Sequence, residues 1–132
     1  MLTDCNINFA LLPKTKDVWA VDYMPIQTEL NKFARFTYNP SYLQTKKLLK
    51  TISDVDAICS HICINTIKTD IILDGGNVTH WTNKVIMTDR IFVDNPQYER
   101  KQLIKKLYEL LQITNSTLFP NNRATSQVIQ TV

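Results

Sequence analysis

The sequence predicts an α/β fold, and three observations support this prediction. Residues 33–38, Phe-Ala-Arg-Phe-Thr-Tyr, are rich in residues that favour β-strands. Leucines recur at helical spacing after Asn95-Pro96. Strand-like and helix-like segments alternate without a linker or a low-complexity segment between them. At 132 residues, with 44% hydrophobic and 20% charged residues, the chain has the length and composition of one globular domain.

The predicted elements follow the strand of residues 33–38 in a simple order. Pro40 is expected to open a short helix that runs to Lys50. Asp54 is expected to cap a second helix that ends near Ile62. Three segments rich in β-branched residues are then predicted to be strands, at residues 67–73, 78–81 and 85–93.

The helix that begins at Asn95-Pro96 has the clearest pattern in the chain. Its apolar stripe comprises Tyr98, Leu103, Leu107, Leu110 and Leu111. The intervening residues Glu99, Arg100, Lys101 and Lys105 are expected to face water. Because this basic cluster and the one at residues 46–50 sit among leucines, and the net charge is only +3, we interpret both as solvated helix faces and expect no nucleic-acid partner.

The apolar runs, the N-terminal pattern and the cysteines indicate in which cellular compartment the protein is expected. No apolar run is long enough to span a bilayer, and the N-terminus lacks the charged and apolar pattern of a signal peptide, so no membrane association is expected. The three cysteines, Cys5, Cys59 and Cys63, are odd in number and show no framework spacing, which fits a reducing compartment. These features predict a cytoplasmic protein.

Two short motifs could carry chemistry. The first places Trp19 three residues before Asp22, so that a turning segment could present an aromatic face beside a carboxylate. A guanidinium group is planar and permanently charged, and is well held by such a combination. The second motif contains the only two glycines, Gly75-Gly76, which are expected to meet a backbone requirement such as a tight turn between two strands.

Residues 17–26, Asp-Val-Trp-Ala-Val-Asp-Tyr-Met-Pro-Ile, and residues 71–78, Ile-Ile-Leu-Asp-Gly-Gly-Asn-Val, together resemble a known family. They are similar to the N-terminal motifs of agmatine deiminases and bacterial, Porphyromonas-type, peptidyl-arginine deiminases. The resemblance extends over residues 14–113. It implies a partial pentein fold, with about two of the five ββαβ modules of that propeller. It also implies hydrolysis of a guanidinium group to a ureido group and ammonia, as in putrescine biosynthesis from agmatine by way of N-carbamoylputrescine.

The resemblance assigns roles to individual residues. Asp22 and Trp19 match the family's substrate-binding aspartate and tryptophan, whereas Val21 replaces its usual arginine. The turn Asp74-Gly75-Gly76-Asn77 matches an acidic-Gly-Gly-Asn turn, which we interpret as supporting the site, with Asn77 in a left-handed or side-chain-capped position. The expected ligand is a small guanidine such as agmatine or a peptidyl arginine. The sequence does not decide between these two substrates.

The groups that would perform the reaction are not expected in this chain. The family's mechanism uses a cysteine thiolate and a histidine, and needs no metal and no cofactor. Cys59 and Cys63 lie on a predicted helix and are interpreted as small buried hydrophobic residues. Cys5 lies near the N-terminus, and His80 lies in a predicted strand. None of them occurs in the family's catalytic context, so the chain alone is predicted to be inactive.

The last residues have a different character from the rest. Residues 1–113 are interpreted as the N-terminal part of a deiminase domain, whereas residues 114–132 are polar and show no clear period. Read in a shifted frame, residues 123–132 permit Gly-Asp-Phe-Thr-Gly-His-Thr-Asp-Gly, which is the family's histidine motif. This reading requires a codon ending in G at Arg123 and in C at Val128. The tail is therefore predicted to be a frameshifted translation that is disordered or loosely attached.

Two alternatives remain open. The chain could be a stand-alone module that binds a guanidinium or arginine side chain without catalysis. It could also be a subunit that a separate chain completes with the histidine and the cysteine. In either case the uncovered strand edges of a partial propeller are expected to favour self-association.

Overall fold

The computed structural model describes residues 8–81, 83–119 and 129–131. Its helices are α1 (Ala20–Tyr23), α2 (Lys46–Leu49), α3 (Val55–His61), α4 (Arg90–Asp94) and α5 (Arg100–Leu111), with short 3-10 turns η1 (Ser41–Leu43) and η2 (Gly75–Asn77). Its strands are β1 (Ile26–Glu29), β2 (Lys32–Thr37), β3 (Thr66–Ile72), β4 (Val78–Trp81), β5 (Lys84–Thr88), β6 (Asn115–Phe119) and β7 (Ile129–Thr131). The prediction of a mixed α/β fold is confirmed.

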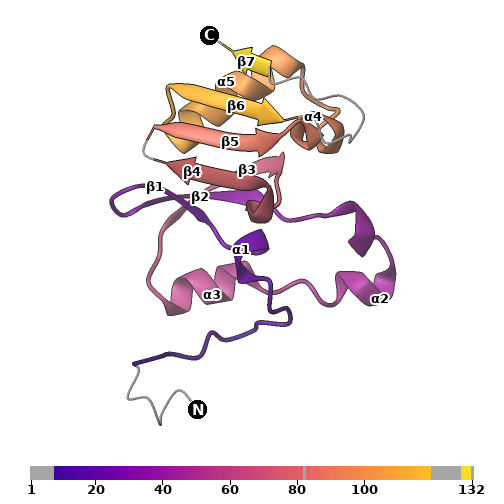
Figure 1. Cartoon of the computed structure of the whole chain (residues 1–132). Helices are drawn as coiled ribbons and strands as arrows, with labels where there is room; N and C mark the ends of the chain where they lie inside the picture. The colour runs from indigo at the N-terminus through magenta and orange to yellow at the C-terminus, as the bar shows by residue number, and fades with distance from the viewer. Residues whose placement is uncertain (1–7, 82, 120–128, 132) are drawn as a thin grey trace.

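The strands form two small sheets of similar construction. In the first sheet, β2 pairs antiparallel with β1 and parallel with β3, which follows α3. In the second sheet, β5 pairs antiparallel with β4 and parallel with β6, which follows α5. Each sheet thus contains a hairpin, a helical connection and a parallel strand, and Figure 1 shows the two sheets side by side.

One hydrophobic core joins the two sheets to α5. Leu103, Leu107 and Leu111 on α5 are at most 4% exposed, as the apolar stripe predicted. They belong to the same buried cluster as residues from β2, β3 and β5, which are Ala34, Phe36, Ile71, Val85 and Met87. The opposite side of α5, including Lys101 and Lys105, is exposed. The expected amphipathic helix is therefore confirmed, but it begins at Arg100, because Asn95 is turned inward and Pro96 lies in the preceding turn.

A smaller cluster packs around α3. Asp54 caps this helix as predicted, since its side chain accepts a hydrogen bond from the Ala57 amide at 3.0 Å. Val55, Ile58 and Cys59 are buried against Tyr23 of α1. The core around α3 therefore fixes the position of the turn that carries the first motif.

The predicted strand of residues 85–93 is wrong in its second half. β5 ends at Thr88, and residues 90–94 form α4. The side chain of Asn95 accepts a hydrogen bond from the Ile72 amide and donates to the carbonyls of Ile72 and Ile91, each at 2.8 Å. These bonds join the end of α4 to the end of β3, so tertiary contacts override the β propensity of this segment.

The C-terminal segment also differs from the expectation. The backbone of residues 115–119 forms β6 beside β5, and residues 129–131 form β7 beside β6. Ladder hydrogen bonds use backbone groups alone, so a strand edge can pair with a segment whose sequence shows no clear period. Residues 120–128 and 132, on which most of the frameshift hypothesis depends, lie outside the described residues, as does Cys5.

Within the described residues, no helix is both long enough and apolar enough to cross a membrane.

Candidate functional site

The first motif forms a single helical turn, and two hydrogen bonds that involve side chains hold it at its ends. The Asp17 carboxylate accepts a bond from the Trp19 amide at 3.0 Å, and the Tyr23 hydroxyl donates to the Asp17 carbonyl at 3.1 Å. Tyr23 is only 3% exposed and anchors α1 to the core around α3. Asp22, one position earlier, is left half-buried. Anchoring by Tyr23 therefore fixes the direction in which the Asp22 carboxylate points.

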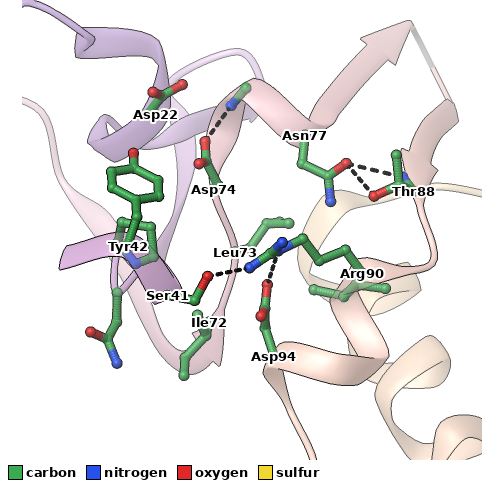
Figure 2. Close-up of a pocket in the computed structure, with 14 residues that line it drawn as sticks. Asp22, Ser41, Tyr42, Ile72, Leu73, Asp74, Asn77, Thr88, Arg90 and Asp94 are labelled. Carbon is green, nitrogen blue, oxygen red and sulfur yellow. Dashed lines mark hydrogen bonds and ion pairs between the residues drawn. The ribbon is translucent and has the colours of Figure 1, made fainter. Parts of the chain in front are cut away.

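The second motif follows β3 as a tight turn. The Asp74 carboxylate accepts a hydrogen bond from the Gly76 amide at 2.9 Å, and the Asp74 carbonyl accepts one from the Asn77 amide at 2.9 Å. The Asn77 side-chain oxygen accepts bonds from the amide and the hydroxyl of Thr88, at 3.1 and 2.8 Å. Figure 2 shows these bonds at the edge of the cavity. The turn is therefore tied to the end of β5.

The two motifs touch each other, and the glycines make this contact possible. A Cβ atom at Gly75 would lie 2.0 Å from the carbonyl oxygen of Val21. A Cβ atom at Gly76 would lie 2.5 Å from an Asp22 carboxylate oxygen. Neither glycine has a positive φ. The expected turn between two strands is confirmed, but its glycines are needed for the close approach of α1.

Asn77 also differs from part of the expectation. It lies in the 3-10 turn η2 and is not among the described residues with positive φ, so it does not take the left-handed conformation. Its side chain is instead held by Thr88, which agrees with the other expectation, a side-chain-bonded asparagine.

A cavity of about 370 Å³ opens beside both motifs. Asp22 and Asp74 lie toward one end of it in Figure 2, and Arg90 lies across from them. The Arg90 guanidinium donates to Asp94 at 3.0 Å and to Ser41 at 2.6 Å. The remaining lining residues come from the turn before η1, from η1 and η2, and from the ends of β3, β5 and α4: Asn39, Pro40, Tyr42, Ile72, Leu73, Gly76, Asn77, Thr88 and Ile91.

The electrostatics of this cavity favour a cation. Three carboxylates, those of Asp22, Asp74 and Asp94, line it together with one guanidinium, that of Arg90. Burial raises the pKa of Asp22 above its usual value, and the neighbouring charge of Asp74 raises it further. A bound cation would offset the repulsion between these two carboxylates, so the arrangement suits a positively charged ligand that can donate hydrogen bonds to both.

The structure brings together most of the predicted site residues, with one exception. Asp22, Asp74, Gly76 and Asn77 line the same cavity, and Gly75 is buried beneath α1. Trp19 is 63% exposed and does not line the cavity. Its assignment to substrate binding stays a prediction.

Several lining residues were not singled out by sequence reasoning. Ser41 and Tyr42 come from η1, while Thr88, Arg90 and Asp94 come from the end of β5 and from α4. The sequence holds no local signal for them, since their common feature is a position in space. The misassigned strand of residues 85–93 also hid the helical spacing of Arg90 and Asp94.

The cysteines and histidines of the described residues do not line this cavity. Cys59 is buried, and burial raises the pKa of its thiol. Cys63 is exposed and takes a positive φ of 56° just after α3, so its predicted burial is wrong. The His80 ring nitrogen lies 3.3 Å from the Leu111 carbonyl oxygen. No cluster of three or more potential metal ligands occurs in the part of the chain that the structure describes.

Comparisons with a family model and with solved structures both find similarity to peptidyl-arginine or agmatine deiminases. A family model of Porphyromonas-type peptidyl-arginine deiminases matches residues 3–130. The structure of C. jejuni agmatine deiminase matches with a TM-score of 0.60 and 21% identity, over 80% of this chain and 33% of that chain. C. jejuni agmatine deiminase with substrate bound gives 0.63 and 20%, over 88% and 37% of the two chains. Agmatine deiminase of Enterococcus faecalis gives 0.60 and 17%, over 79% and 32%.

These structural matches show a shared fold, and the chain spans about a third of the length of the solved relatives. A comparison with curated proteins finds no significant match.

Proposed function

The chain belongs to the Porphyromonas-type peptidyl-arginine deiminase family, and on this basis we propose that it forms the guanidinium-binding part of a deiminase site. The contact between its two motifs carries the proposal. Asp22 and Asp74 come from segments about fifty residues apart, yet both line one cavity whose charged groups are three carboxylates and one guanidinium. Two carboxylates can together accept several N–H bonds from one guanidinium group, which fixes the orientation of the group.

The proposed reaction of the complete site is hydrolysis of a guanidinium carbon–nitrogen bond. Water supplies the oxygen of the ureido product, and ammonia leaves. In this proposal Asp22 and Asp74 bind and orient the group, while Asn77 holds the turn of Asp74 against β5. A thiolate and a proton-transferring imidazole would have to come from elsewhere, because no cysteine or histidine of the described residues lines the cavity. We therefore expect this chain to bind without turning over.

Calorimetric titration with agmatine tests the binding step. We expect saturable binding by the 132-residue chain and at least tenfold weaker binding by Asp22→Asn, since a hydrogen bond to a charged group contributes about 1.5–3 kcal/mol. Glu109→Gln serves as the matched control, because it removes one negative charge outside this cavity. Equal losses in Asp22→Asn and Glu109→Gln would reduce the effect to net charge and contradict the proposal.

Ammonia release and ligand choice are measured in the same samples. We expect no ammonia from agmatine, free arginine or an arginyl peptide, and turnover that Asp22→Ala abolishes would overturn the expected inactivity. Comparing the affinities of these three compounds addresses the choice between a small guanidine and a peptidyl arginine. Binding without turnover also fits the stand-alone binding module.

The origin of the C-terminal residues separates the broken enzyme from the stand-alone module. We propose that residues 114–132 translate the family's histidine segment in a shifted frame, on the basis of the codon reading of residues 123–132. Sequencing the gene tests this directly. A third base of G at Arg123, a third base of C at Val128 and an open shifted frame downstream would support the proposal. Any other base at these two positions would contradict it and favour an evolved binding module.

Self-association is a further expectation of the proposed partial fold. β4 is an edge strand, and the outward-facing Trp81 and Ile86 on β4 and β5 are 78% and 46% exposed. We propose that a second copy covers this face. Sedimentation velocity should show a concentration-dependent dimer that Trp81→Lys abolishes, whereas a monomer at all concentrations would contradict this proposal.

A further inference from the structure

The charged groups of the cavity form two sets that come from different elements. Asp22 lies on α1 and Asp74 caps η2, whereas Arg90 and Asp94 both lie on α4. Figure 2 shows Arg90 and Asp94 across the cavity from Asp22, beside Ser41. Because the proposed function gives Asp22 and Asp74 to the guanidinium group, the pair on α4 would meet the other end of the ligand.

Arg90 is held in a fixed position and still has donors to offer. Its Nε atom donates to Asp94 at 3.0 Å, and an Nη atom donates to the Ser41 hydroxyl at 2.6 Å. These two bonds use two of the five N–H donors of a guanidinium group. The side chains of Arg90 and Asp94 are 41% and 27% exposed, and both line the cavity. The site therefore presents a preoriented cation that can bind a carboxylate.

The charge pattern of this pair suits a ligand end that carries both signs of charge. A carboxylate against Arg90 and an ammonium against Asp94 would place every charge beside an opposite one. An ammonium alone, as in agmatine, would reach Asp94 only close to the Arg90 guanidinium, and the like charges would repel each other. Arg90 also joins α4 to η1 through Ser41, and ligands with and without the carboxylate separate this structural role from ligand binding.

From this arrangement we infer that the cavity takes free L-arginine in preference to agmatine. The inference rests on the proposed function and names the ligand of the same site. Asp22 and Asp74 hold the guanidinium group. Arg90 binds the α-carboxylate of the ligand, and Asp94 binds its α-ammonium. The cavity volume of about 370 Å³ lies in the range of small-molecule sites.

A series of ligands titrated into the full wild-type chain by calorimetry tests the inference. We expect L-arginine to bind about tenfold more tightly than agmatine, which lacks the carboxylate. L-Argininamide, with a neutral amide in place of the carboxylate, and Nα-acetyl-L-arginine, which lacks the ammonium, should each bind about tenfold more weakly than L-arginine. Equal affinities for L-arginine and L-argininamide, or tighter binding of agmatine, would overturn the inference. This series uses the unaltered chain, so no effect of a substitution on folding enters its result.

Variants then pair the ligand carboxylate with Arg90. Arg90→Gln should weaken the binding of L-arginine about tenfold and leave agmatine bound at least as tightly as in the wild type. Arg90→Lys keeps the positive charge and should recover part of the affinity for L-arginine. Lys101→Gln is the matched control, since it removes an exposed cation outside the cavity, and its affinity for L-arginine should stay within about twofold of the wild type.

A further variant pairs the ligand ammonium with Asp94. Asp94→Asn should weaken the binding of L-arginine but not that of Nα-acetyl-L-arginine, which has no ammonium to lose. Circular dichroism checks that each variant is folded. Equal losses for both ligands in Asp94→Asn, or for L-arginine and agmatine in Arg90→Gln, would make the ion pair of α4 a structural feature and overturn the inference.

The outcomes separate the inference from the proposed function. Agmatine binding that Asp22→Asn weakens, without tighter binding of L-arginine, would overturn the inference and leave the guanidinium site standing. Absence of any binding by the wild-type chain would overturn both.

Discussion

The contact between α1 and η2 should make Gly75 the most sensitive position of the site. A Cβ atom at Gly75 would lie 2.0 Å from the Val21 carbonyl oxygen, whereas carbon and oxygen atoms normally approach to about 3.3 Å. Gly75→Ala must therefore move α1 away from η2 by about 1 Å. Because the obstructing atom belongs to the backbone, a side-chain rotation cannot relieve this clash.

Two opposing effects set the expected change in the free energy of unfolding of Gly75→Ala. Overpacking of this kind costs up to about 3 kcal/mol. Replacing a glycine whose φ is negative returns up to about 1 kcal/mol, because the unfolded chain loses freedom. We expect Gly75→Ala to lower the free energy of unfolding by about 2 kcal/mol. The displacement of Asp22 from Asp74 should also weaken agmatine binding by tenfold or more, on the order of the penalty for a 1 Å misplacement in a site.

Gly76→Ala provides the matched comparison. Its Cβ atom would meet the Asp22 side chain at 2.5 Å, and this carboxylate can rotate away. We expect nearly unchanged stability in urea unfolding, but weakened agmatine binding in calorimetry. The reasoning is refuted if Gly75→Ala unfolds at the same urea concentration as the wild type, or if Gly76→Ala binds agmatine with unchanged affinity.

Four further predictions concern pH and the core. Since the pKa of Asp22 is raised in the folded chain, its contribution to stability is fully present below pH 3.8 and is lost as pH rises through the raised pKa; urea unfolding of Asp22→Asn should lack this decline. Agmatine affinity should rise over the same window as Asp22 ionises, and Asp74→Asn should move its midpoint to lower pH. Asn95→Ala removes the buried bond to the Ile91 carbonyl and the partly buried bonds to the Ile72 backbone, and should lower the free energy of unfolding by about 3 kcal/mol; a loss below about 1 kcal/mol would contradict the bridging role. Leu103→Ala should cost about 2–5 kcal/mol, and an unchanged unfolding midpoint would exclude Leu103 from the core.

Elements with a strong local pattern could be predicted from the sequence. The apolar stripe of α5 has the helical period, and Asp54 stands at the start of α3 with a side chain that can accept from the first turn. The strand of residues 33–38 was found for a similar reason, because its residues suit a half-buried sheet. α4 was missed, because its side chains favour a strand and its end is held by Asn95 through contacts with β3.

The sequence by itself determined the two motifs, and through them the family and the candidate carboxylates Asp22 and Asp74. Only the tertiary structure decided how the site is assembled. It turned Trp19 outward, brought Tyr42 and Arg90 into the cavity, and explained Gly75 by the approach of α1. Each of these facts depends on contacts between segments far apart in the chain, and residue patterns that report local backbone preference and burial carry no record of such contacts.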